Sequence, residues 1–408
     1  MEYIKRALER KFLEMNGAFK AILVTGARQV GKTTMLKHLA INEGRTFVSM
    51  DNAQDRDLAQ RDPKLFFQMY KPPILIDEAQ KAPELFEYIK QLCDETDQKG
   101  LFWLTGSESK KLLKEAGDSL AGRICILRMY SLSQREKCGR ADTDKFEYSF
   151  DALVKRQAGF EINNINDVYT HIWRGGMPGT LSYNEEQLSE FYSSYIDTYL
   201  MRDAVEDNGI TDIIAFKKVL TACAAFVGSI VNYSDIANAG GVSVPTAKNW
   251  INVLQNMGIV YLLQPYSNNE LKRLCKTPKL YFCDTGLAAY LSMWTSRDVL
   301  MNGAASGHYY ENYVVGEFLR YYAYSESKAN FTFYRDSNQK EIDLIIEENG
   351  ILHPVEIKRS SNPEPKLVKA FDVLKVSSNQ LGLGLVACMA DKVFPINDNN
   401  VLIPSNII

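Results

Sequence analysis

The chain has 408 residues, of which 46% are hydrophobic and 24% are charged, and its formal net charge is −3. This composition is typical of globular proteins and excludes a largely disordered chain, and the length predicts about two to four domains. The small negative charge excludes a protein that is basic throughout, so any nucleic-acid binding has to come from local patches.

Other functional classes are excluded by what the sequence lacks. The seven cysteines form no CxxC pair and the four histidines have no zinc spacing, which favours reduced, buried thiols over a metal site. The first residues, MEYIKRALERKFLEM, alternate charged and apolar residues at helical spacing, unlike a secretion signal. No apolar run approaches the roughly 20 residues of a membrane span. We therefore expect a soluble, cytoplasmic protein.

The stretch AILVTGARQVGKTTMLKHLA predicts a strand from Ala21 to Thr25, a glycine-bounded loop, and a helix that begins near Lys32. The loop follows the pattern GxxxxGKT, in which backbone N–H groups and the helix N-terminus surround a phosphate. Lys32 is expected to reach the outer phosphates and the Thr33 hydroxyl to bind Mg²⁺. The residues predicted to hold the nucleotide are Gly26, Ala27, Arg28, Gln29, Val30, Gly31, Lys32, Thr33 and Thr34.

A second motif, PPILIDEAQ, predicts a buried strand from Ile74 to Ile76 that ends in Asp77 and Glu78. Asp77 is expected to hold Mg²⁺, and Glu78 is expected to orient or deprotonate the attacking water. Together with the phosphate-binding loop, this acid pair predicts a Mg²⁺-dependent ATPase.

A third strand, LFWLT at 101–105, is followed by GSES. Thr105 or Ser107 is a candidate sensor of the γ-phosphate, with a simple turn as the alternative. In SLAGRICIL, Arg123 is a candidate arginine finger, within its own subunit or for a neighbour, with a solvated arginine as the alternative. The alternation of strands and helices through residue 130 predicts an α/β fold with a mostly parallel sheet and helices on both faces.

These motifs resemble a known family. GARQVGKTT, ILIDEAQKAPELF, LTGS and SLAGR are similar to the predicted AAA-type ATPases of archaea and bacteria that carry a C-terminal domain of unknown function. Four later segments, WRGGMP, YLMRD, PKLYFCDTGLA and YENYVVGEF, resemble the C-terminal part of that family. The resemblance covers nearly the whole chain. It implies an AAA-like core, a helical region, a winged-helix segment and an end that resembles restriction endonucleases, but it implies no substrate.

The predicted division is an ATPase domain at 1–135, a helical lid or linker at 136–215, a winged-helix segment at 216–290 and a restriction-endonuclease-like domain at 291–408. In the linker, WRGGMP is predicted to be a loop between helices, although Arg174 could approach a phosphate. Arg202 and Asp203 are predicted to form a structural ion pair.

The winged-helix prediction rests on three helices, at 216–228, 232–240 and 243–258, followed by strands at 259–266 and 278–284. In a DNA reader the third helix would enter the major groove, and the basic loop between the strands would contact phosphates. The alternative is that this segment packs on the ATPase domain or on a protein partner. The candidate contacts are Thr246, Lys248 and Asn249 on the helix, and Lys272, Arg273 and Lys276 in the loop.

The stretch EIDLIIEENGILHPVEIK, 341–358, predicts a hairpin in which Glu356 and Lys358 share a face. Asp343 lies thirteen residues before Glu356. Nucleases of the restriction type use an aspartate and a glutamate to hold Mg²⁺ or Mn²⁺, with a lysine beside the attacking water. Glu317 is the expected third acid, with Glu311 as the alternative. The opposing interpretation is a fold kept for binding, whose acids are solvated or ion-paired.

Three functions are compatible with these motifs, and all three use ATP and Mg²⁺. The first is an ATPase that binds or remodels nucleic acid, DNA in particular. The second is a metal-dependent nuclease gated by ATP. The third is a regulatory ATP switch that binds a protein partner. A homo-oligomer would be required if Arg123 served a neighbouring subunit.

Overall fold

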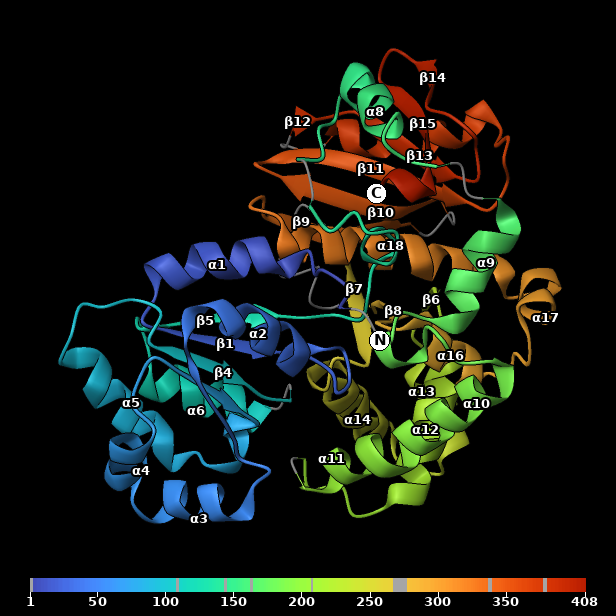
Figure 1. The fold of residues 1–408 in the computed structure, drawn as a ribbon. Coiled ribbons are helices and arrows are strands. Elements are labelled where there is room, and N and C mark those ends of the chain that lie inside the picture. Colours follow the sequence, from blue (N-terminus) through green and yellow to red (C-terminus); the bar gives the residue numbers. More distant parts are fainter. Residues whose placement is uncertain are drawn as a thin grey trace.

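The computed structural model describes residues 3–107, 110–142, 145–161, 164–206, 208–266, 277–336, 340–376 and 380–408. Two sheets organise these residues (Figure 1). The first lies in the N-terminal third of the chain, and the second combines strands from the middle and from the C-terminal end.

The first sheet has five parallel strands in the order β2-β3-β4-β1-β5. Their bounds are β1 (Ala21–Thr25), β2 (Thr46–Ser49), β3 (Ile74–Asp77), β4 (Phe102–Thr105) and β5 (Ile124–Arg128). The strands β1, β3 and β4 are buried along their whole length, as expected for a sheet covered on both faces. This part of the predicted α/β fold is confirmed, down to the bounds of β1.

Side-chain alternation along the strands separates two apolar clusters. Ile22 and Val24 pack with α1 (Leu8–Ala18) and α2 (Lys32–Ala40). Ala21 and Leu23 pack on the opposite face. That face is covered by α3 (Ala53–Arg61), α4 (Pro63–Met69), α5 (Glu84–Asp94) and α6 (Lys110–Ser119).

Helical elements dominate residues 134–206, but they do not form one bundle. The helix α8 (Phe150–Gln157) contacts β15 (Asn400–Pro404) of the second sheet, and α9 (Ile165–Arg174) packs beside α17 (Arg297–Asn302) (Figure 1). The remaining elements are α7 (Gln134–Lys137), η3 (Pro178–Thr180), α10 (Glu185–Ser194), the π-helical segment η4 (Tyr195–Leu200) and α11 (Met201–Glu206).

The next segment contains the three helices and the strand pair that the sequence predicts. The helices are α12 (Ile213–Ala224), α13 (Tyr233–Gly240) and α14 (Val244–Asn256), and the last is capped by the Ser243 side chain. The strands β7 (Val260–Pro265) and β8 (Lys279–Phe282) pair antiparallel, and β6 (Ser229–Ile230) joins β8.

The second sheet is mixed and has ten strands among the described residues. The C-terminal part begins with α16 (Thr285–Leu291), α17 and the long helix α18 (Ser306–Tyr324). Its strands are β9 (Ala329–Arg335), β10 (Glu341–Glu348), β11 (Ile351–Lys358), β12 (Gln380–Leu381), β13 (Gly384–Cys388), β14 (Phe394–Asn397) and β15. Because β7 pairs with β9, the strands of the middle segment are continuous with those of the C-terminal domain.

The predicted hairpin is confirmed as β10 and β11, with Leu344 opposite Val355. Asn349 and Gly350 turn the chain with φ values of 52° and 79°, the left-handed pair that two-residue hairpins favour. In the described part of the chain, no helix is both long enough and apolar enough to cross a membrane. Of the six described cysteines, three are buried and Cys138 is exposed.

Candidate nucleotide site and the carboxylate cluster

A cavity of about 590 Å³ opens at the carboxyl ends of the parallel strands, where ligands of open α/β sheets bind. Polar side chains from the phosphate-binding loop and from β3 line one part of it, and residues of the N-terminal segment and of η3 line another. The lining residues are Tyr3, Ile4, Arg6, Arg28, Gln29, Gly31, Lys32, Thr33, Thr34, Asp51, Glu78, Leu132, Pro178, Gly179 and Tyr199.

Backbone conformation in the loop explains its glycines. Gly26 has a φ of 144° and Gly31 a φ of 97°, which glycine adopts without strain. A Cβ on Gly26 would clash with the Met129 carbonyl. Gln29, with a φ of 61°, is one of the few described non-glycine residues in the left-handed region, where strain is often found at functional sites.

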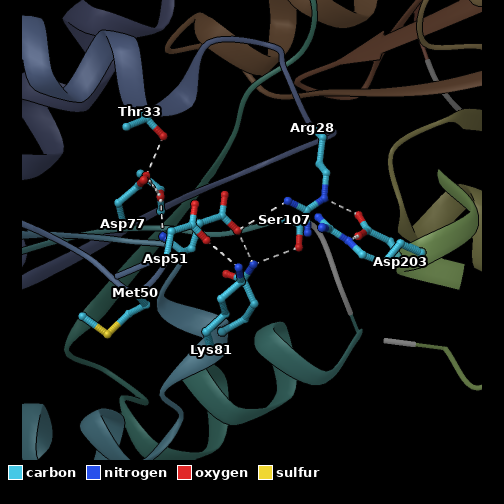
Figure 2. Close-up of polar contacts among 12 residues, drawn as sticks. Arg28, Thr33, Met50, Asp51, Asp77, Lys81, Ser107 and Asp203 are labelled. Atoms are coloured by element: carbon cyan, nitrogen blue, oxygen red, sulfur yellow. Dashed lines mark hydrogen bonds and ion pairs between the residues drawn. The ribbon is translucent and has the colours of Figure 1, made fainter. Parts of the chain in front are cut away.

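The two predicted magnesium ligands lie together. The Thr33 hydroxyl donates to Asp77 Oδ1 at 2.5 Å, and Thr105 Oγ1 donates to the same oxygen at 2.6 Å (Figure 2). Ser49 Oγ lies 3.4 Å from Asp77 Oδ2. This set of hydroxyl and carboxylate oxygens is the hard chemistry that Mg²⁺ requires, so the residues present fit this ion.

Glu78 follows at the end of β3 and also has a left-handed backbone, with a φ of 55°. Its N–H donates to Thr105 Oγ1 at 3.1 Å. Gln80 donates to Glu78 Oε2 at 2.5 Å and to Ser107 Oγ at 3.2 Å. Of the candidate sensors, Thr105 therefore contacts the acid pair directly, and Ser107 contacts it through Gln80. Thr105 is fully buried.

Lys32 is 6% exposed, and its Nζ donates to the carbonyl oxygens of Gly26 and Ala27 at 2.9 and 2.8 Å. Arg28 leaves the loop in another direction. Its Nε lies 2.6 Å from Asp203 Oδ2, and its Nη1 lies 3.8 Å from Glu78 Oε2 (Figure 2). The predicted pair of Arg202 with Asp203 is present, but at 3.9 Å it is longer than the pair that Asp203 makes with Arg28.

The sequence analysis missed the N-terminal contribution to this site. Tyr3 stacks on His38 of α2 with ring centroids 3.8 Å apart. Arg6 is buried, pairs with Glu136 at 2.9 Å, and donates to the Val30 carbonyl of the phosphate-binding loop. Arg6 and Glu136 are 130 residues apart, and nothing in the sequence identifies them as partners.

Arg123 is not brought to the nucleotide cavity. It precedes β5, and the register places Ile124 opposite Ala21, at the end of the sheet away from the phosphate-binding loop. Its Nε and Nη2 bind Asp94 at 2.6 and 3.0 Å. A role within its own ATP site does not agree with this position, and a role in a neighbouring subunit stays a prediction.

Arg174 also has a structural position. Its guanidinium donates to the Thr180 and Tyr183 carbonyls and holds the turn of the WRGGMP loop, as the simpler interpretation predicts. On α14, Lys248 and Asn249 are exposed and Thr246 is half-buried. Lys272, Arg273 and Lys276 lie outside the described residues.

The C-terminal carboxylates form a second cluster. Asp343 Oδ2 accepts from the Ile357 N–H at 2.9 Å, and Lys358 lies 2.7 Å from Glu356 and 3.6 Å from Asp343. Glu311 belongs to this cluster, because it shares Lys279 with Asp343. Glu317 does not. Its carboxylate pairs with Arg320 at 3.2 Å and accepts from the Gln134 N–H.

Lys279 of β8 occupies the centre of these acids. Its Nζ is 2.5 Å from Glu341, 2.9 Å from Glu311 and 3.7 Å from Asp343. Burial, followed by the Asp343 charge, raises the pKa of Glu311 and of Glu356 to about 7. Among the described residues no group of three histidine, cysteine, aspartate or glutamate side chains is placed to hold a metal. These acids are therefore ion-paired with Lys279 and Lys358, as the opposing interpretation predicts, and a divalent metal at this cluster stays a prediction.

Three family models match successive parts of the chain. A family model described as "AAA domain" matches residues 18–138, "Domain of unknown function (DUF8612)" matches 165–298, and "Domain of unknown function (DUF4143)" matches 306–408. The uncharacterized protein Rv2008c of Mycobacterium tuberculosis is 26% identical over 99% of this chain and 82% of its own length. The uncharacterized protein MJ1637 of Methanocaldococcus jannaschii is 21% identical over 90% of this chain and 81% of its own length.

Solved structures found by comparison include the Thermotoga maritima RuvB Holliday junction branch migration motor. It is 16% identical, with a TM-score of 0.26 over 62% of this chain and 85% of that chain. A STAND protein with a tetratricopeptide repeat sensor from Pyrococcus horikoshii is 12% identical, with a TM-score of 0.28 over 79% of this chain and 47% of its own. The family matches show that the chain carries an AAA-type P-loop ATPase domain and ends in a C-terminal domain of unknown function.

Proposed function

We propose that this protein binds ATP with Mg²⁺ in the strand-end cavity and hydrolyses its terminal phosphoanhydride bond. The observation that carries the proposal is the 2.5 Å contact between Thr33 and Asp77, which unites the phosphate-binding loop and the acid pair at one sheet edge. Lys32 would bind the outer phosphates, and the Thr33 and Asp77 oxygens would hold the ion. Glu78 would orient the attacking water and accept its proton.

The same cavity offers a place for the adenine base of ATP. Tyr3, Ile4, Leu132 and Pro178 line it together with the phosphate-binding residues. Apolar and aromatic side chains of this kind suit a purine ring. The cavity volume of about 590 Å³ lies within the usual range of ligand sites, roughly 300–1,000 Å³.

The proposal is tested by steady-state ATP hydrolysis and nucleotide binding in the wild type and two variants. Glu78→Gln should bind ATP but turn over about 10²- to 10⁴-fold more slowly, the usual contribution of a general base. Lys32→Ala should lose binding, because it removes the cation that faces the phosphates. Wild-type turnover by Glu78→Gln would show that another group activates the water.

A nucleic-acid partner is proposed for the three-helix segment, on the observation that α14 exposes Lys248 and Asn249. ATP hydrolysis should then rise several-fold with duplex or single-stranded DNA at low salt and fall back as salt increases, because phosphate contacts release counterions. Lys248→Ala should reduce the stimulation, and Lys37→Ala, on α2, is the control. A rate that ignores DNA would favour a protein partner.

Phosphodiester cleavage by the C-terminal cluster is not part of the proposal, because Lys279 already pairs with Glu311, Glu341 and Asp343.

A further inference from the structure

We propose that Asp203 is a positioning residue for ATP hydrolysis. It holds the Arg28 guanidinium at a position from which that group orients the Glu78 carboxylate without forming a close ion pair with it. The helical segment that contains η4 and α11 would thereby control turnover in a site to which it contributes no phosphate-binding residue. This inference rests on the proposed ATPase function.

The three side chains form a nearly enclosed row. Arg28 is bonded to Asp203 at 2.6 Å and lies 3.8 Å from Glu78. The exposed fractions of the three side chains are 15%, 9% and 16%, so solvent screens these charges weakly. The short contact is a charge-assisted hydrogen bond, and the longer one is an electrostatic attraction. Of these two contacts Asp203 makes the shorter one, and the Glu78 carboxylate is oriented by the longer one without being closely paired.

The helical segment holds Arg28 by more than this one carboxylate. Tyr195 of η4 donates to the Arg28 carbonyl at 3.4 Å, and the Tyr199 ring lies 5.8 Å from the Arg28 guanidinium. Asn208 donates to the Asp203 carbonyl at 3.1 Å. The backbone and the side chain of one loop residue thus contact the same segment, which is about 170 residues further along the chain. Figure 2 shows Arg28 and Asp203 facing each other across the gap between their ribbons.

Gln80 donates to the same oxygen, Glu78 Oε2, at 2.5 Å. The orientation of the acid therefore depends on a neutral amide and on a cation whose own position is set by Asp203. Without the Asp203 charge, the guanidinium is expected to move fully onto Glu78. A carboxylate drawn into a close ion pair is turned away from the position in which it orients the water, so the hydrolysis step should slow while ATP binding remains.

The test is a set of five variants assayed for kcat and KM. Asp203→Asn should lower kcat about tenfold with KM within about twofold of wild type, the pattern of a lost transition-state interaction. Asp203→Glu should recover part of kcat. Asp197→Asn is the matched control, because Asp197 lies on the same segment but pairs with Lys217 in solvent, with side chains 53% and 49% exposed; it should match wild type.

The decisive comparison uses Arg28→Gln with and without Asp203→Asn. If Asp203 acts through Arg28, adding Asp203→Asn to Arg28→Gln should change neither kcat nor KM. An equal loss in both backgrounds would overturn the inference, because Asp203 would then act as a structural residue. A wild-type kcat in Asp203→Asn would also overturn it. These outcomes are distinct from a failure of the ATPase proposal, in which wild type itself would not hydrolyse ATP and both proposals would fall.

Discussion

Arg28 and Arg123 belong to one domain, yet their surroundings give them different uses. Arg28 lies beside the cavity between two acids and is largely buried. Arg123 binds Asp94 at the surface, at the opposite end of the strands. Both residues carry the same charge, and only the first is placed where its charge acts on the proposed catalytic acid.

The two glutamates of α18 likewise differ in their surroundings. Glu311 and Glu317 are six residues apart, which turns one away from the other on a helix of 3.6 residues per turn. Glu311 faces Lys279 and Tyr281 of β8. Glu317 faces Arg320 and the backbone of α7. Which of the two glutamates joins the carboxylate cluster depends on how α18 is rotated against its neighbours.

The C-terminal cluster should make stability depend on pH. Burial raises the pKa of Glu356 to about 7 from an ordinary value near 4.5, so the folded protein keeps a proton that the unfolded chain releases between these values. Stability should therefore fall as pH rises from 5 to 8, by on the order of 1–3 kcal/mol. Glu356→Gln should remove the part of this loss of stability that comes from Glu356. Urea unfolding at several pH values measures it.

The control for this prediction is Glu364→Gln, whose side chain is 66% exposed and pairs with Lys366. It should follow the wild-type dependence. If wild type and Glu356→Gln lose stability in parallel, the buried acid does not titrate in this range.

At the scale of elements, the segments WRGGMP and CDTGLA, which resemble family motifs, contact each other. In WRGGMP, the Gly176 N–H donates to Asp284 Oδ2 at 2.8 Å. In CDTGLA, Asp284 caps α16 through the Leu287 N–H and accepts from the Tyr192 hydroxyl. The glycines allow close approach. A Cβ on Gly176 would lie 2.5 Å from the Leu132 carbonyl.

Gly176→Ala should therefore destabilise the protein by about 1–3 kcal/mol, the usual cost of overpacking, as measured by thermal or urea unfolding. Gly307→Ala on α18 is the matched control, because a Cβ there meets nothing within 4 Å. That control should be neutral or slightly stabilising. Equal stability of the two variants would mean that the loop moves aside without cost.

On the scale of the whole molecule, the predicted boundary near residue 290 is crossed in two ways. The strands β7 and β9 pair in parallel across it, at Gln264 opposite Thr332. Lys279 on one side neutralises Glu311, Glu341 and Asp343 on the other. Removing one partner from a buried ion pair costs roughly 3–5 kcal/mol.

We expect residues 291–408 alone not to fold cooperatively, because the shorter chain exposes the edge of β9 and leaves the acids without Lys279. Residues 213–408 should fold. Urea unfolding followed by circular dichroism would compare the two. A single cooperative transition in the shorter chain would show that the C-terminal domain is independent of the strands before it.

The sequence predicted the first third of the fold closely, because its signals are local. A strand of four apolar residues and a threonine, a glycine loop and a helix follow one another around GxxxxGKT, and the structure has them within the predicted bounds. The three helices before β7 are also confirmed, since caps such as Ser243 mark their beginnings. In contrast, Arg6 with Glu136, Arg28 with Asp203 and Lys279 with Glu311 join segments remote in the sequence, and no spacing rule relates them.

By itself, then, the sequence determined the glycine loop after β1 and the acid pair at the end of β3, because backbone conformation and side-chain chemistry are properties of short segments. It also determined the hairpin that carries Asp343, Glu356 and Lys358. Only the tertiary structure decided what those residues face. Lys279 enters the carboxylate cluster through the packing of β8 against α18, and Asp203 reaches Arg28 through the position of α11. Charges buried at such contacts interact through space, so their effect depends on distance and burial that the order of residues does not contain.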